Sequence, residues 1–123
     1  HLSSMVKKAN DSILIMSSEQ GITRKYHTLQ KHLKKAAKKK VNIKIAAPFS
    51  NDSKILSELK NQFEVKSIDS VQGRFVLVDQ NELLFMIKHD ENVHPSFDSG
   101  IWVNNSYFAK TLHDMFHHTW QNS

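Results

Sequence analysis

The sequence predicts an α/β fold built on a mixed, mostly parallel sheet with helices on both faces, in the order α-β-α-β-α-β-β-β-β-α. Apolar runs of strand length alternate with amphipathic segments in the first half, which is typical of right-handed β-α-β units with parallel strands. In the second half, two strand-like runs flank a short turn, so a hairpin joins the same sheet. The length of 123 residues is that of one domain, and we expect residues 1–123 to fold as a single unit.

The first half supplies the expected parallel strands. Ile13-Leu14-Ile15-Met16 is continuously apolar, which predicts a strand buried on both faces. A second strand stops at Pro48, which cannot continue the ladder. Asn51-Asp52-Ser53 suit a helix cap, so a short helix is expected to follow them. The expected strands are residues 13–16, 41–47 and 63–68. One helix is expected to end at residue 8, a second to run from about residue 23 to 40, and a third to contain Ile55, Leu56 and Leu59.

The second half supplies the hairpin and a closing helix. Asp79-Gln80-Asn81-Glu82 has the composition of a hairpin turn between two apolar runs. Residues 88–99 are polar and are expected to form a loop. Asn104-Asn105-Ser106 can cap the last helix. The expected strands are residues 74–79, 83–87 and 101–103, and the closing helix carries Phe108, Leu112, Met115, Phe116 and Trp120 on one face.

The composition excludes several classes of function. The chain has no cysteine, which removes disulfides, thiol catalysis and thiolate metal sites and fits a reducing compartment such as the cytoplasm. No apolar run approaches the roughly 20 residues that cross a bilayer, so no membrane partner is expected. The formal net charge is +5, but residues 1–60 carry thirteen Lys or Arg and four acids, whereas residues 61–123 carry four and eight.

Most of the positive charge lies on one predicted helix. At about 100° per residue, five lysines fall opposite the apolar face that contains Leu29 and Leu33. Lys40 is expected in the last helical turn, where a cation suits the helix dipole. Such a surface either keeps the protein soluble or acts as a nucleic-acid-binding module, and the first interpretation is favoured because no aromatic residue or arginine is interleaved. This basic face consists of Lys31, Lys34, Lys35, Lys38 and Lys39.

Gln72, Arg74 and Asp79 form the most informative pattern. Their spacing is that of the phospholipase D signature, a His, a Lys two residues later and an Asp five residues after that, and the chain resembles one half of that fold. In that superfamily the His attacks phosphorus, the Lys steadies the phosphate charge and the Asp supports the motif. Here an amide replaces the nucleophile and cannot form a phospho-enzyme intermediate. Arg74 keeps the charge, so the motif is degenerate and no catalytic residue is expected.

A phospholipase D-like fold without the His resembles the TrmB family of archaeal-type transcription regulators. The stretches that carry the resemblance are residues 9–18, residues 33–47, and residues 100–104 with the closing helix up to Trp120. The resemblance implies a non-enzymatic, effector-sensing and dimerisation domain, excised from a longer chain whose upstream domain binds DNA. It implies a homodimer and a small-molecule effector, with no cofactor and no metal. Sugar recognition is not implied, because the sugar-binding members carry extra sequence after this domain.

An effector is expected beyond the carboxyl ends of the parallel strands, where such sheets bind ligands. The clearest electrostatic role belongs to Arg74, as a counter-charge for an anionic group. The two serines after the first strand suit either helix caps or the polar lining of a crevice. The candidate ligand-binding residues are Gln72, Arg74, Ser17, Ser18 and Asn104.

Further interpretations stay open beside this one. The chain would be a phospholipase D-type phosphodiesterase or nuclease if it used a non-standard nucleophile such as His89. His113 and His117 have a spacing that can chelate a metal, but no third ligand shares their side of the helix, so surface histidines are favoured. Tyr107 or Trp120 is expected at the edge of the closing helix, where aromatic residues contribute to dimer contacts.

Overall fold

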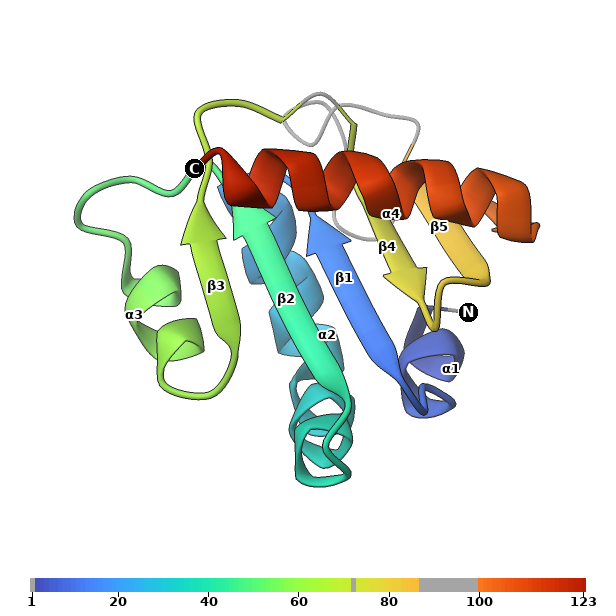
Figure 1. The fold of residues 1–123 in the computed structure, drawn as a ribbon. Helices are drawn as coiled ribbons and strands as arrows, with labels where there is room; N and C mark the ends of the chain where they lie inside the picture. Colours follow the sequence, from blue (N-terminus) through green and yellow to red (C-terminus); the bar gives the residue numbers. More distant parts are fainter. Residues whose placement is uncertain (1, 72, 87–99) are drawn as a thin grey trace.

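The computed structural model describes residues 2–71, 73–86 and 100–123 (Figure 1). Its elements follow the predicted order, α-β-α-β-α-β-β-β-β-α. The helices are α1 (Leu2–Lys7), α2 (Glu19–Lys38), α3 (Lys54–Lys60) and α4 (Ser106–Gln121). The strands are β1 (Ser12–Met16), β2 (Asn42–Ala47), β3 (Glu64–Ser67), β4 (Phe75–Val78), β5 (Glu82–Met86) and β6 (Gly100–Asn104).

The six strands form one sheet in the order β3-β2-β1-β4-β5-β6. The predicted mixed α/β class is confirmed, but the sheet is not mostly parallel. The β1–β2 and β2–β3 pairs are parallel, whereas the β1–β4, β4–β5 and β5–β6 pairs are antiparallel. A parallel pair needs a long crossover, usually a helix, and the described part of the chain between β3 and β6 contains no helix.

Helices cover both faces of the sheet, as predicted. In Figure 1, α4 crosses one face of the sheet and α2 lies behind the opposite face. Each face has its own apolar core, because side chains alternate between the two faces along every strand. Ile13 and Ile15 of β1 belong to the core on the side of α1, α2 and α3, whereas Leu14 and Met16 belong to the core under α4.

The amphipathic helix α2 starts and ends differently from the prediction. It begins at Glu19 rather than near residue 23, because the Ser18 hydroxyl accepts a hydrogen bond from the Gly21 N–H at 3.1 Å and caps the first turn. Lys40 lies beyond the last turn, with a left-handed φ of 68°. The Lys40 and Val41 N–H groups donate to the carbonyl oxygens of Ala37 and Ala36, which is the hydrogen-bond pattern of a Schellman motif.

The edge strand β6 approaches β5 closely at Gly100. A Cβ atom at this position would lie 2.4 Å from the carbonyl oxygen of Phe85, so a larger residue would push the two strands apart. Gly100 pairs with Met86 at one end of β6, and Asn104 pairs with Glu82 at the other end. The close approach explains why a glycine begins this strand.

Helix α4 is capped by Asn105, whose side-chain oxygen accepts from the N–H groups of Tyr107 and Phe108. The predicted apolar face is confirmed for Leu112 and Phe116, which are buried. Phe108 and Met115 are 45% and 37% exposed, because they lie on the flank of the helix rather than at the centre of the buried face. No helix in the described ranges is long and apolar enough to span a bilayer.

Candidate functional site

The carboxyl ends of the three parallel strands meet at one edge of the sheet. Ser17 follows β1, Pro48 follows β2 and Ile68 follows β3. Because Met16 pairs with Phe75 in an antiparallel register, the start of β4 lies at the same edge and brings Arg74 next to Ser17. The structure therefore brings together part of the predicted site at the expected edge.

Ser17 is completely buried. Its N–H donates to the Ala46 carbonyl at 3.2 Å, and its hydroxyl oxygen has no hydrogen-bond partner within residues 2–71, 73–86 and 100–123. The alternation along β1 and β4 places Ser17 and Arg74 on the α2 side of the sheet, because Met16 and Phe75 belong to the core under α4. The Arg74 carbonyl accepts from the Met86 N–H at 3.0 Å and extends the β4–β5 ladder.

Two segments at this edge are tied together by Glu19. Its carboxylate oxygen Oε1 accepts from the Ser50 N–H at 3.0 Å, which links the first turn of α2 to the segment after β2. An acid in the first turn also suits the positive end of the helix dipole. Ser18, the neighbouring predicted ligand residue, serves as the cap of α2. Ser18 and Glu19 therefore have structural partners, in contrast to the Ser17 hydroxyl within the described part of the chain.

The other two predicted residues lie at the opposite edge of the sheet or outside the described ranges. Asn104 was expected near the strand ends, but its pairing with Glu82 places it at the far end of β5, about a strand length from Arg74. The error comes from the antiparallel direction of β6, which a short apolar run in the sequence does not reveal. Gln72 falls outside the described residues, and so does His89.

Asp79, the acid of the degenerate motif, holds two segments together at that opposite edge. Its carboxylate oxygens accept from the N–H groups of Asn10, Asp11 and Ser12 at 2.8 to 3.2 Å. Its own N–H donates to the Ser12 carbonyl at 2.8 Å. The carboxylate thus satisfies three backbone donors in the loop before β1, which is a structural role away from Arg74.

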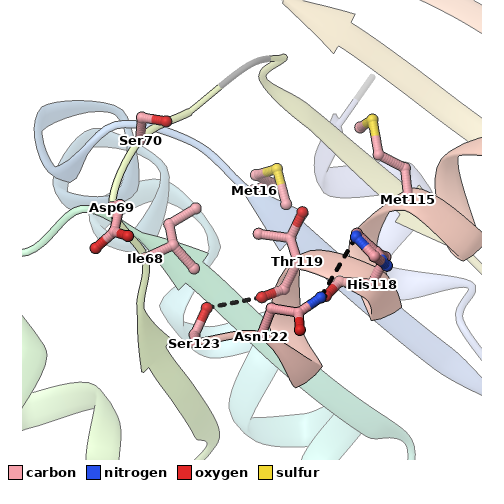
Figure 2. A pocket seen from close by; sticks show the side chains of 9 residues that line it. All are labelled: Met16, Ile68, Asp69, Ser70, Met115, His118, Thr119, Asn122 and Ser123. Carbon is pink, nitrogen blue, oxygen red and sulfur yellow. Dashed lines mark hydrogen bonds between the residues drawn. The ribbon is translucent and has the colours of Figure 1, made fainter.

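A cavity of about 360 Å³ opens at the carboxyl edge of the sheet on the α4 side (Figure 2). Figure 2 shows Asp69 and Ser70 on one wall, and Met115 and His118 on the other. The Asn122 side chain bridges to His118, donating to its backbone carbonyl at 2.8 Å. The lining residues are Met16, Ile68, Asp69, Ser70, Met115, His118, Thr119, Asn122 and Ser123.

The sequence predicts a site at this edge of the sheet but does not predict the residues that line the cavity. The segment after β3 and the last turns of α4 are about fifty residues apart in the sequence, and only the packing of α4 across the sheet brings them together. The one signal available in the sequence was the polar pair Asp69-Ser70 shortly after a strand. Arg74 does not line the cavity, which lies on the other side of the sheet.

Beside the cavity, Trp120 is held between α4 and the sheet. Its ring stacks on Phe116 with centroids 5.6 Å apart, and the Nζ atoms of Lys44 and Lys66 lie 5.4 and 5.2 Å from the Trp120 ring. Lys66 Nζ also donates to the Trp120 carbonyl at 2.9 Å. Trp120 therefore stabilises the domain from within, by cation–π contacts and by capping the end of α4 with a cation.

His113 and His117 form a pair on α4, and His117 lies near Lys44. The ring centroids of His113 and His117 are 4.4 Å apart, and His113 Nδ1 lies 3.3 Å from a carboxylate oxygen of Asp114. Burial lowers the pKa of His117, with further contributions from His113 and Lys44. Among the described residues, no group of three His, Cys, Asp or Glu is arranged to hold a metal ion.

Solved structures define the class of fold. TrmBL2, described as an archaeal chromatin protein with a novel mode of DNA binding, matches with a TM-score of 0.72 and 19% identity over 98% of this chain and 47% of its own. The chain thus spans about half the length of TrmBL2. Nuc from Salmonella typhimurium, a phospholipase D family member, has a TM-score of 0.70 and 15% identity over 98% of this chain and 84% of its own.

NucT from Helicobacter pylori matches with a TM-score of 0.72 and 9% identity over 98% of this chain and 85% of its own. The fold is therefore phospholipase D-like, as predicted. Among curated protein sequences, none matches the chain significantly.

The family follows from the sequence. The family model described as "Transcriptional regulator TrmB, EBD N-terminal subdomain" matches residues 1–123. The chain belongs to the TrmB family of transcription regulators and corresponds to the N-terminal part of their effector-binding domain.

Proposed function

We propose that this chain is a non-enzymatic, effector-sensing and dimerisation unit of a cytoplasmic transcription regulator that reaches its operator through a separate DNA-binding domain. The observation that carries the proposal is the cavity between the end of β3 and the end of α4. Its walls combine apolar side chains with hydroxyl, amide, imidazole and carboxylate groups, a mixture typical of small-molecule sites. A small polar metabolite with an apolar portion fits this chemistry best.

Dimerisation is supported by a second feature, an exposed apolar patch on β6 and α4. Tyr107 is 87% exposed, and Phe108 packs its ring edge-on against Phe85 with centroids 5.8 Å apart. Large apolar side chains exposed together are typical of protein interfaces. The apolar patch consists of Ile101, Tyr107, Phe108 and Met115.

Met115 connects the two features, because it belongs to the apolar patch and also lines the cavity. An effector that contacts Met115 would therefore change the surface presented to a second copy. Ligand affinity and dimer affinity are then coupled, and the coupling acts equally in both directions. In a regulator, such a coupling would set the spacing of attached DNA-binding domains.

Thermal unfolding in the presence of a metabolite panel tests the effector site. The panel holds polyols, amines and organic acids, and a true effector at about 100 times its dissociation constant should raise the melting temperature by roughly 10 °C. Thr119→Trp fills the cavity and should abolish the rise. Thr28→Trp, an exposed threonine on α2 outside the cavity and the apolar side chains of α4, is the matched control and should retain it.

Arg74→Ala separates the two sides of the sheet in the same assay. A rise that survives Arg74→Ala and disappears in Thr119→Trp places the effector in the cavity. A rise that disappears in Arg74→Ala but survives Thr119→Trp would move the site to the α2 side. If no metabolite class shifts the melting temperature, the effector-sensing part of the proposal fails.

Analytical ultracentrifugation tests the dimer. Tyr107→Asp introduces a charge into the apolar patch and should shift the chain from dimer to monomer. Gln121→Asp adds a charge near the other end of α4, outside the patch, and should leave the dimer intact. A wild-type chain that sediments as a monomer at about 100 μM would contradict the proposal, since regulators of this kind need a stable pair.

The alternative of phosphodiester hydrolysis has a direct test. Incubation with a chromogenic phosphodiester should give no turnover above the uncatalysed rate, because an amide replaces the nucleophile of the signature. His89→Ala and His118→Ala are the informative variants, since His118 is the histidine that lines the cavity among the described residues. Turnover that vanishes in either variant would overturn the non-enzymatic assignment.

A further inference from the structure

The basic face of α2 is fully formed in the folded chain. Lys31, Lys35, Lys38 and Lys39 are exposed and Lys34 is half-buried, while the opposite side of the helix packs into the core through Ile22, Leu29 and Leu33. With a rise of about 1.5 Å per residue, the lysines from 31 to 39 extend over about 12 Å. The helix therefore presents a continuous row of ammonium groups to solvent.

Helix α2 carries no acid within this row. The sequence contains no Asp or Glu between Glu19 and Asp52, and α1, which packs on α2, ends in Lys7 followed by Lys8. Within residues 2–71, 73–86 and 100–123, none of the five lysines forms an ion pair. Among the described residues, the charge of the basic face is therefore not neutralised by an ion pair.

Repulsion between these lysines destabilises the helix. Lys31 lies three and four residues from Lys34 and Lys35, which in turn precede Lys38 and Lys39 at the same spacings. Each like-charge pair at such spacing destabilises a helix by about 0.2–0.5 kcal/mol. A surface that served solubility alone would interleave acids and avoid the repulsion. A polyanionic partner removes the repulsion on binding.

We infer that the basic face binds the phosphate backbone of double-stranded DNA without reading its sequence. One strand of a duplex carries a phosphate about every 3.4 Å along the axis, so a 12 Å row faces roughly three or four of them. Lysines are point charges that suit phosphates without base specificity. The face has no aromatic residue on which unpaired bases could stack, which favours a duplex over a single strand.

This contact would supplement the operator contacts of a regulator and does not depend on the effector cavity. The residues that line the cavity lie after β3 and at the end of α4, at the carboxyl edge of the parallel strands. Helix α2 ends at the opposite edge of the sheet (Figure 1). Duplex binding would bring the effector-binding domain down onto the DNA that flanks an operator. Affinity would then depend on the length of the duplex as well as on its sequence.

Fluorescence anisotropy with a labelled duplex of about 20 base pairs and unrelated sequence tests the inference. Binding should weaken steeply between about 50 and 200 mM KCl, with a slope of log K against log[salt] near −3 to −4 for three or four phosphate contacts. The triple variant Lys34→Gln, Lys35→Gln, Lys38→Gln should reduce the slope by about 2 to 3 and the affinity at the lower salt by at least about tenfold.

The control variant has the same net charge. Lys54→Gln, Lys60→Gln, Lys110→Gln removes three exposed lysines from α3 and α4 and should keep the wild-type slope. Replacing the three α2 lysines by arginine should also keep it. Circular dichroism establishes that each variant is folded before binding is compared.

Three outcomes would overturn the inference. Equal losses in the two glutamine variants would mean that only the overall charge matters. Tighter binding to a single-stranded oligonucleotide, or to vesicles with anionic lipid, would assign the face to another polyanion. No binding to the duplex at about 50 mM KCl would leave the face as a solvated surface.

Discussion

Asp79 shows how an acid at the spacing of a catalytic signature can serve the fold. Its carboxylate accepts three backbone N–H groups before β1, and its own backbone occupies a left-handed conformation with φ of 55° in the hairpin turn. Asp and Asn tolerate that conformation better than most residues. The acid therefore serves the fold, independently of the amide at position 72.

Substitution of Asp79 should reveal that role. Asp79→Asn keeps the left-handed preference and one oxygen acceptor, so we expect a loss of about 1 kcal/mol in the free energy of unfolding. Asp79→Ala loses all acceptors and is disfavoured at positive φ, so the loss should reach about 2–3 kcal/mol. Urea titration measures both, with Asp11→Asn as a neighbouring control that removes the same charge. Equal stability of the wild type and Asp79→Ala would contradict the assignment.

His117 should make stability depend on pH. Burial, His113 and Lys44 lower its pKa below the ordinary value of 6.5. As the pH falls through 6.5, the unfolded chain takes up a proton that the folded chain does not yet bind, so the free energy of unfolding decreases below this pH and recovers above it. His117→Gln should remove this part of the slope between about pH 5 and 7.5.

The control for this measurement is His27→Gln, an exposed position on α2. It should retain the wild-type dependence of stability on pH. A slope that is unchanged in His117→Gln would mean that other groups account for it.

At the scale of the element, the end of α2 contains an unfavourable backbone conformation. Lys40 has a left-handed φ, which is unfavourable for any residue with a Cβ atom, and glycine is the usual residue there. Lys40→Gly should raise the free energy of unfolding by about 0.5–1 kcal/mol. Lys39→Gly is the matched control: its φ is −82°, so glycine gains nothing and should be destabilising. Chemical denaturation of the two variants should give opposite signs.

Most elements could be predicted because their signals are local. The apolar run of β1, the amphipathic pattern of α2 and the cap of α4 depend on residues a few positions apart, and each is confirmed. The start of α2 was placed too late, since a Ser-Glu pair after a strand is a weak signal. Phe108 and Met115 were expected on the same face as Leu112 and Phe116, but they are partly exposed. Helical spacing predicts the apolar side of a helix but not how much of that side the sheet covers.

The candidate site was predicted less completely than the fold. Ser17 and Arg74 lie at the expected edge, because Ser17 follows β1 and Arg74 precedes β4, which runs antiparallel to β1. Asn104 lies at the opposite edge, because the direction of an edge strand depends on its connection. The burial of Lys25, whose ammonium donates to the Gly21 carbonyl at 3.4 Å, also has no sequence signal, since a lysine at the border of an apolar face usually extends to solvent.

On the scale of the whole molecule, two cores share one sheet, and α4 supplies most of the cover for the second. Phe116 is completely buried and contacts Phe75 edge-on with centroids 6.4 Å apart. Phe116→Ala should lower the free energy of unfolding by about 3–5 kcal/mol. Met115→Ala, the neighbouring residue with 37% exposure, should cost less than about 1 kcal/mol.

Urea titrations of both variants test this assignment, followed by tryptophan fluorescence and by circular dichroism. The two signals should coincide, because neither core can persist when the shared sheet is lost. A fluorescence transition that precedes the loss of helix would show that α4 detaches on its own.

The length of α4 has a mechanical consequence. Sixteen residues form a rod of about 24 Å, with the metabolite-sized hollow at its last turns and the outward-facing Tyr107 at its first turn. A tilt of only about 5° about the hollow would carry Tyr107 through about 2 Å, as much as helices move in allosteric transitions. A displacement too small to alter the chemistry at one end would thus move an exposed aromatic side chain at the other.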